Sequence, residues 1–92
     1  MSTDLIRHNP ESGRFEAGGE SNPAHLDYRM SNGVVQIFHT EVPAEYQGQG
    51  LAGKLATAAL VWARGAGFQV HPTCSYVTGF IAKRPEYSDL LA

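Results

Sequence analysis

The sequence predicts a compact α+β fold in which antiparallel strands lead into a strand, helix, strand unit with helices packed on the sheet. First, Asn32-Gly33 lies between two segments of alternating polarity, a pattern typical of a β-hairpin. Second, apolar residues recur at helical spacing over residues 49–64, and a short strand-like segment follows at residues 68–72. Because the chain has only 92 residues, we expect residues 1–92 to form one domain.

The strand predictions begin with residues 13–17, which a glycine-rich turn ends. The hairpin follows with strands at residues 24–30 and 34–40, and Pro43 closes its second strand because proline cannot donate to a ladder. A two-residue turn places Met30 opposite Val35, Tyr28 opposite Ile37, and Leu26 opposite His39. This register predicts one apolar sheet face, and it places His39 on that face.

Two helices are predicted after the hairpin. The first covers residues 49–64 and carries apolar residues at Leu51, Leu55, Ala58, Ala59 and Trp62. Residues 68–72 then return as a strand that pairs in parallel with the second hairpin strand. The second helix begins near Ser75, with Tyr76, Val77, Phe80 and Ile81 at helical spacing, and residues 85–92 form a terminal segment.

Composition argues against several classes of function. Nine acidic and seven basic residues give a net charge of −2 without a basic stripe, so nucleic acid is not an expected partner. The longest apolar stretch, LATAALVWA, is shorter than a membrane span, and the first residues lack a signal pattern, so we expect a cytoplasmic protein. The single Cys74 cannot form an internal disulfide, and His8, His25 and His71 lack metal-ligand spacing, so no metal is expected.

The stretch PAEYQGQGLAGKL places Gly48, Gly50 and Gly53 where a strand gives way to a helix. The unpaired first amides of such a helix form a natural anion site, so phosphate binding is physically reasonable. The spacing matches neither the Walker phosphate loop nor the dinucleotide fingerprint. The alternative interpretation is a glycine loop that only eases the strand into the helix.

The same residues carry a resemblance. EVPAEYQGQGLAGKLATAAL resembles the acetyl-CoA signature of the GNAT acetyltransferases, Gln/Arg-x-x-Gly-x-Gly/Ala, with Gln47, Gly50 and Ala52 in the defined positions. Over nearly the whole chain, the segments DYR, HTEVP, GQGLA, CSYV and PEY are similar in order to small stand-alone GNAT-like acetyltransferases. The resemblance implies the GNAT fold and acetyl-CoA as co-substrate.

The resemblance also implies which residues contact the cofactor. The strand end at Val42 would pair through its main chain with the pantetheine arm. The pyrophosphate contacts would come from Gln47, Gly48, Gln49, Gly50, Leu51 and Ala52.

Cys74 and Glu41 are the candidate catalytic residues. Cys74 precedes the second helix, where helix-start amides would favour the thiolate, and the resemblance places it close to the acyl group. It would accept the acetyl group, donate a proton to CoA, or fill the apolar seam. Glu41, beside Val42, would act as the base directly or through a water; the alternative is a solvated charge or a structural hydrogen-bond acceptor.

Other residues are weaker candidates. His39 is a second-rank base, because its predicted place on the apolar face favours a hydrogen-bonded core histidine. Tyr76 and Tyr87 are candidate general acids, although core packing is the preferred interpretation of Tyr76. Lys83-Arg84 would meet a CoA phosphate or, in the preferred interpretation, place favourable charge at a helix end.

The expected function is acetyl-CoA-dependent transfer of an acetyl group to an unidentified amine, on a small molecule or a protein. The paired amino-terminal helices of larger GNAT domains have no counterpart in the predicted elements, so the acceptor groove should be open. The alternative functions are a CoA-binding or regulatory interaction module without efficient turnover, and a structural domain without a nucleotide ligand.

Overall fold

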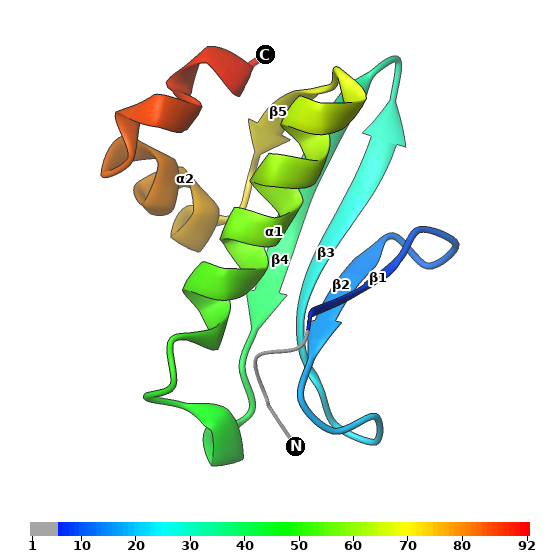
Figure 1. Cartoon of the computed structure of the whole chain (residues 1–92), viewed down its shortest axis with the longest axis vertical. Coiled ribbons are helices and arrows are strands. Elements are labelled where there is room, and N and C mark those ends of the chain that lie inside the picture. The colour runs from blue at the N-terminus through cyan, green and yellow to red at the C-terminus, as the bar shows by residue number, and fades with distance from the viewer. Residues whose placement is uncertain (1–5) are drawn as a thin grey trace.

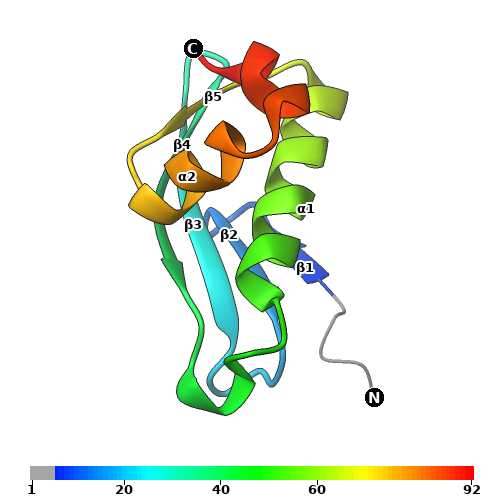
Figure 2. The same cartoon turned by 90° about the vertical axis from the view of Figure 1, so that its left-hand side faces the viewer.

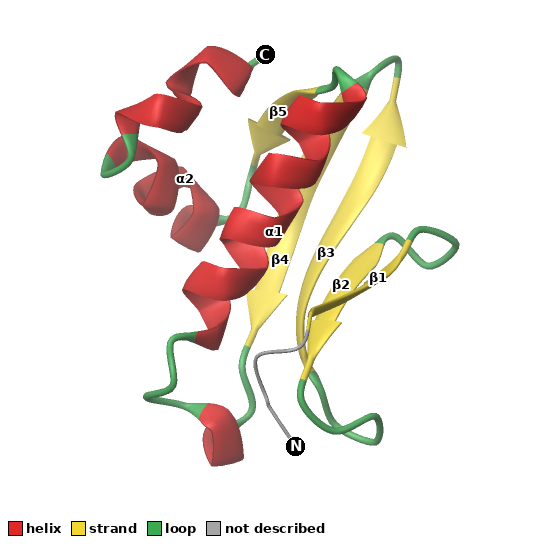
Figure 3. Ribbon diagram, viewed as in Figure 1, coloured by secondary structure: helices red, strands yellow, loops and turns green. Residues whose placement is uncertain are grey.

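The computed structural model describes residues 6–92, and it consists of one five-stranded sheet with helices on one side (Figures 1 and 3). The strands lie in sequence order, β1 (Ile6–Asn9), β2 (Arg14–Ala17), β3 (Ala24–Ser31), β4 (Val34–Glu41) and β5 (Gln69–Pro72). The first four are antiparallel, and β4 and β5 are parallel. The α+β fold and the β4, helix, β5 unit are therefore confirmed.

Helix α1 (Leu51–Ala66) crosses the sheet, and α2 (Ser75–Ala82) packs beside β5 (Figure 1). Seen nearly edge-on, the sheet has α1 on one side only (Figure 2). Two short 3₁₀ helices, η1 (Ala44–Tyr46) and η2 (Pro85–Leu90), complete the elements. After η2, Leu91 bridges to Val70 and extends the outer edge of β5.

The buried core lies between the sheet and α1. The buried helix residues are Leu51, Leu55, Ala56, Ala59, Leu60 and Ala63. The sheet contributes Phe15, Leu26, Tyr28, Val35, Ile37 and Val70, among others. Small alanines on α1 let the helix approach the sheet closely, so that the larger strand residues fill the remaining space.

The hairpin turn is confirmed in detail. Asn32 and Gly33 have φ angles of 52° and 78°, the two positive values that a type I′ turn requires. Met30 pairs with Val35, and Tyr28 pairs with Ile37, as expected. Met30 is nevertheless 43% exposed, and it lies only two residues before the turn.

The predicted register is wrong beyond Tyr28, because β4 contains a bulge. Leu26 pairs with Thr40, and Asp27 pairs with His39, so Phe38 is the extra residue. The bulge turns His39 to the helix-free face, where its imidazole is exposed, and brings Thr40 to the face of α1. An imidazole on the apolar face would have been desolvated, which the bulge avoids.

Strand β1 was not predicted from the sequence. Ile6–Asn9 pairs with β2 through a tight turn, so four antiparallel strands precede α1 where three were expected. The β1 sequence, IRHN, is mostly polar, and the imidazole of His8 makes its main contact with the aromatic core. The ring of His8 stacks on Phe15, with centroids 4.0 Å apart, and its Nε2 lies 2.6 Å from the Tyr28 hydroxyl.

Candidate functional site

Strands β4 and β5 separate at the end that leads into α1. Their parallel pairing runs from Val34 to Ile37 on β4. The amides of Thr73 and Cys74 then both donate to the Ile37 carbonyl, at 2.9 and 3.2 Å, before the chain turns into α2. Residues 38–41 of β4 keep β3 on one side and have no β5 partner on the other. We call this opening the fork. It exposes a strand edge to which an extended ligand can add.

The glycine loop after β4 adopts a conformation that other residues rarely adopt. Gly48 and Gly50 have φ angles of 84° and 74°. Gly50 is the N-cap of α1 and leaves the first helix turn without a side-chain cap. A Cβ atom at either glycine would meet no atom within 4 Å, so their conformation rather than crowding requires glycine. Because no side chain caps the first turn of α1, its helix-start amides are left for a ligand to bind.

The predicted cofactor residues lie around one cavity of about 360 Å³. Its lining is Val42, Tyr46, Gln47, Gly48, Gly50, Leu51 and Ala52. Of the seven predicted residues, only Gln49 is outside this lining. The Gln47 side chain donates from Nε2 to the Val42 carbonyl at 3.3 Å, which ties the loop to the strand end. A ligand that pairs with the Val42 main chain would therefore use its amide.

Tyr46 is a lining residue that sequence reasoning missed. Its hydroxyl accepts a hydrogen bond from the Gly19 amide at 2.7 Å. A Cβ on Gly18, whose φ is 90°, would lie 2.8 Å from the Tyr46 ring. The close approach of backbone to ring holds the glycine loop against the β2–β3 connection. The Gly18-Gly19 pair is the sequence signal, since adjacent glycines often mark close packing as well as a turn.

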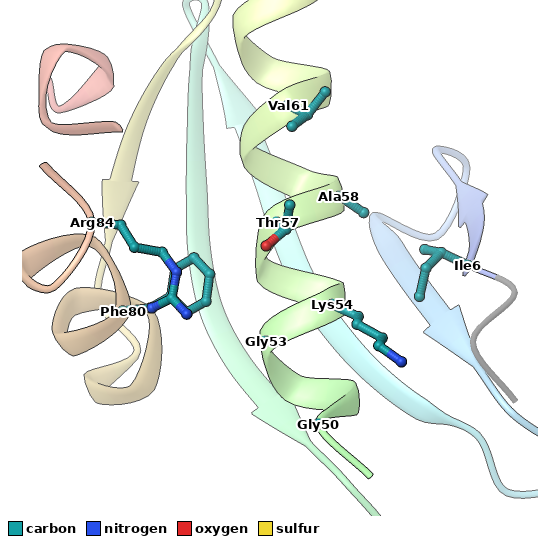
Figure 4. Close-up of a pocket in the computed structure, with 9 residues that line it drawn as sticks. All are labelled: Ile6, Gly50, Gly53, Lys54, Thr57, Ala58, Val61, Phe80 and Arg84. Carbon is teal, nitrogen blue, oxygen red and sulfur yellow. The ribbon is translucent and has the colours of Figure 1, made fainter. Parts of the chain in front are cut away.

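A second groove of about 560 Å³ adjoins the first at Gly50 (Figure 4). It follows the outer face of α1 along Gly53, Lys54, Thr57, Ala58 and Val61, with Ile6 on one side and Phe80 and Arg84 on the other. The Arg84 guanidinium stacks on Phe80, with Cζ 3.9 Å from the ring centroid. Arg84 thus faces this groove, and the stacking holds a positive charge at its edge.

Cys74 lies at the fork as the N-cap of α2, and it is half-buried. Its Sγ is 3.5 Å from the Thr40 Oγ1 across the opening. Thr40 was not among the predicted site residues, and the unbulged register would place it on the opposite face. The two residues bring a thiol and a hydroxyl together beside the unpaired edge of β4.

Glu41 lies on the other side of the sheet from Cys74. Neighbouring strand residues point to opposite faces, so Thr40 faces the thiol and Glu41 faces away. The Glu41 carboxylate is 3.2 Å from His39 Nε2, and both side chains are exposed. The structure thus does not bring the two predicted catalytic residues into contact. The prediction of His39 as a core histidine is wrong.

The two candidate tyrosines lie in different places and make different contacts. Tyr76 is 42% exposed, so its interpretation as core packing is wrong, and its hydroxyl would lie 3.5 Å from a Cβ on Gly53. Tyr87 lies on η2, where the Arg64 guanidinium is 6.0 Å from its ring. Arg64 also pairs with Asp89 at 2.9 Å, and that hydrogen bond holds the pKa of Asp89 below its usual value.

Comparisons with known proteins indicate the family of this chain. The family model of GCN5-related N-acetyl-transferases matches residues 14–90. Protein NATD1 of Danio rerio is 32% identical over 89 residues, which are 92% of this chain and 81% of that protein. Protein NATD1 of Bos taurus is 40% identical over 52 residues, 56% of this chain, and the match spans 46% of the bovine protein, about half its length.

The fold has a solved relative as well. The solution NMR structure of a GCN5-like candidate N-acetyltransferase from Staphylococcus aureus superposes with a TM-score of 0.80 at 30% identity. The match covers 100% of this chain and 91% of that one. Within residues 6–92, none of the helices is long and apolar enough to cross a membrane. The chain belongs to the GCN5-related N-acetyltransferase family.

Proposed function

We propose that the chain is an acetyl-CoA-dependent N-acetyltransferase that moves an acetyl group to an unidentified amine. The observation that carries the proposal is the continuity of the glycine loop, the fork and Cys74. Uncapped helix amides, an unpaired strand edge and a thiol follow one another along one side of β4. A ligand with a phosphate at one end, an amide-containing arm and a thioester would meet each in turn.

The residues divide the binding task between them. The amides of the loop from Gln47 to Ala52 would hold the pyrophosphate, because helix-start N–H groups favour anions. The Val42 amide would hydrogen-bond to the pantetheine arm in the fork. Arg84, at the edge of the adjoining groove, would then neutralise a further phosphate of CoA. This role is the less favoured of the two interpretations that the sequence allows for Lys83-Arg84.

The chemistry requires an amine without its extra proton, attack on the thioester carbonyl, and protonation of the departing CoA thiolate. In the direct route, the amine attacks and Cys74 donates its proton to the thiolate. In the covalent route, the Cys74 thiolate takes the acetyl group with release of CoA, and the amine then displaces it. Glu41 would remove the amine proton through a water, since its carboxylate lies on the far face. Thr40 positions the thiol at 3.5 Å.

The acceptor side of the fork is open, so amines of different sizes can reach it. Among the described residues, no α-helix precedes α1, and the segments before the hairpin are β1 and β2. Nothing in that part of the chain roofs the fork from the amino-terminal side, so a protein amine fits as well as a small one. A cytoplasmic location is part of the same proposal.

A thermal-shift titration with CoA is the first test. A ligand at a hundredfold excess over its Kd stabilises the folded state by about 2.7 kcal/mol, which raises the Tm of a domain this size by roughly 10 °C or more. Inorganic phosphate is the control for simple anion binding. No shift at millimolar CoA would refute the cofactor assignment.

The second test separates an enzyme from a CoA-binding module, the alternative that shares the same loop. Transfer from acetyl-CoA to a panel of small amines and lysine peptides is measured by CoA release and product mass. Intact mass of the protein after incubation with acetyl-CoA reports acetylation of Cys74. Binding with neither transfer nor acetylated protein would favour the module.

A further inference from the structure

The helix-free face of the sheet carries a group of metal-ligating side chains on β3 and β4. His25, Asp27 and His39 each offer one donor atom, and these three atoms lie within 4.8 Å of one another. We call these residues the histidine cluster. The His25 Nδ1 is 3.1 Å from the Asp27 Oδ1, and the two imidazole centroids are 5.6 Å apart.

The bulge in β4 is what assembles this cluster. It pairs Asp27 with His39 and His25 with Glu41, so alternate residues of two neighbouring strands project from one face. In the unbulged register His39 would lie on the apolar face, away from His25. Spacing along the sequence compares His25 with His8 and His71, so it does not reveal that His39 lies beside His25 across the two strands.

We propose that the histidine cluster binds a divalent transition-metal ion of the zinc, cobalt or nickel class. Two imidazoles and a carboxylate are a donor set that these ions prefer and that magnesium and calcium do not. Two ligand atoms on a tetrahedral zinc ion lie about 3.4 Å apart, given bond lengths near 2.1 Å. His25 Nδ1 and Asp27 Oδ1, 3.1 Å apart, are near that separation, and the His39 donor atom lies within 4.8 Å of both.

Burial divides the cluster into a fixed part and an adjustable part. The side chains of His25 and Asp27 are each 14% exposed, whereas that of His39 is 49% exposed. Two ligands are therefore held by packing, and the third can move onto the ion from the solvent side. The open side leaves room for water in the remaining coordination positions. Glu41, 3.2 Å from His39 Nε2, supplies the neighbouring carboxylate that usually orients a ligating imidazole.

Arg14 competes with a metal ion for the Asp27 carboxylate, and this competition can be tested. Its Nε donates to the Asp27 Oδ1 at 2.8 Å, so a guanidinium already occupies part of the carboxylate. Binding of a metal must displace or share that bond. Replacing Arg14 by glutamine removes the competing charge and should tighten metal binding severalfold.

The experiment uses the whole chain without a histidine tag. Zn²⁺ and Ni²⁺ are titrated by calorimetry, and Co²⁺ by its visible absorption. We expect one ion per chain, an affinity loss of tenfold or more in His25→Ala and in His39→Ala, and tighter binding in Arg14→Gln.

Control variants identify the metal ligands and distinguish the loss of a ligand from a folding defect. His71→Ala removes another exposed histidine, one strand away on β5, and should leave the affinity unchanged. Cys74→Ser tests thiol binding and should also leave it unchanged. Far-UV circular dichroism and the Tm without ligand show that each variant is folded. Absence of binding at millimolar Zn²⁺, or binding that survives His25→Ala with His39→Ala, would overturn the proposal.

Discussion

The two ends of α1 are built for different purposes. Near its carboxyl end, Trp62 lies among aromatic rings of the sheet, with centroids 4.7 Å from His8, 5.7 Å from Phe15 and 5.2 Å from Tyr28. At its amino end, the helix faces an uncapped glycine loop, an unpaired strand edge and two adjoining cavities. The filled end stabilises the fold, and the open end leaves polar backbone groups for a ligand to satisfy. Packing and binding are therefore separated along one helix.

Trp62→Ala tests the filled end, and we expect the largest effect there. Loss of the ring should lower the free energy of unfolding by about 3 kcal/mol, the lower end of the range for a large aromatic residue, since Trp62 is half-buried and gives up its contacts with these rings. Urea denaturation measures the loss. The folded fraction of the variant should bind CoA with unchanged affinity, and a loss below about 1 kcal/mol would contradict the described packing.

Cys74→Ala tests the open end by its chemistry. Acetyl transfer should fall ten- to thousandfold, as expected for loss of a positioned acid or nucleophile, while CoA affinity is unchanged. Stability should change by about 1 kcal/mol or less, because the thiol is only half-buried. Steady-state kinetics with the best amine of the panel gives the rates.

Two further measurements on the thiol sharpen this prediction. Cys74→Ser should recover much of the rate if only a proton donor is needed, and should stay impaired if the sulfur is the nucleophile. Bound acetyl-CoA should protect Cys74 from alkylation by a small electrophile. Full activity in Cys74→Ala would leave Glu41 as the catalytic residue to pursue.

Gly50 and Gly67 allow a direct comparison of the two ends. Both cap α1 with positive φ, 74° and 80°, and a Cβ on either would meet no atom within 4 Å. Gly50→Val and Gly67→Val should therefore each cost about 1–2 kcal/mol of stability through backbone strain. Only Gly50→Val should weaken CoA binding, measured by calorimetry below the Tm of both variants. Equal CoA affinities in the two variants would remove the glycine loop from the binding site.

The pH dependence of stability also tests the filled end of α1, and we expect its effect to be the smallest. Burial lowers the pKa of the His8 imidazole below 6.5, so the unfolded chain binds this proton more readily than the folded chain. The stabilising contribution is complete above about pH 6.5 and is lost as the pH falls toward the folded-state pKa. His8→Phe should show a smaller loss of stability between pH 7.5 and pH 5 than the wild type. An identical loss in urea titrations would assign the pH dependence to other groups.

Much of this structure follows from local sequence. The Asn32-Gly33 turn, the periodicity of α1 and the loop from Gln47 to Ala52 each depend on residues close together in the chain. Turn conformations, helical faces and glycine-dependent backbone angles are local properties, and so they can be read from short segments. The family resemblance that implied the cofactor residues also rests on one short segment, and six of the seven residues lie around one cavity.

Only the tertiary structure decided which distant side chains meet. One extra residue at Phe38 reversed the faces of His39 and Thr40, because side chains alternate along a strand. That single shift placed Thr40 beside Cys74, separated Glu41 from the thiol, and joined His39 to His25 and Asp27. A bulge depends on what the neighbouring strand and helix can bury together. Periodicity in one segment does not contain that information, so the contacts on each side of β4 required the assembled sheet.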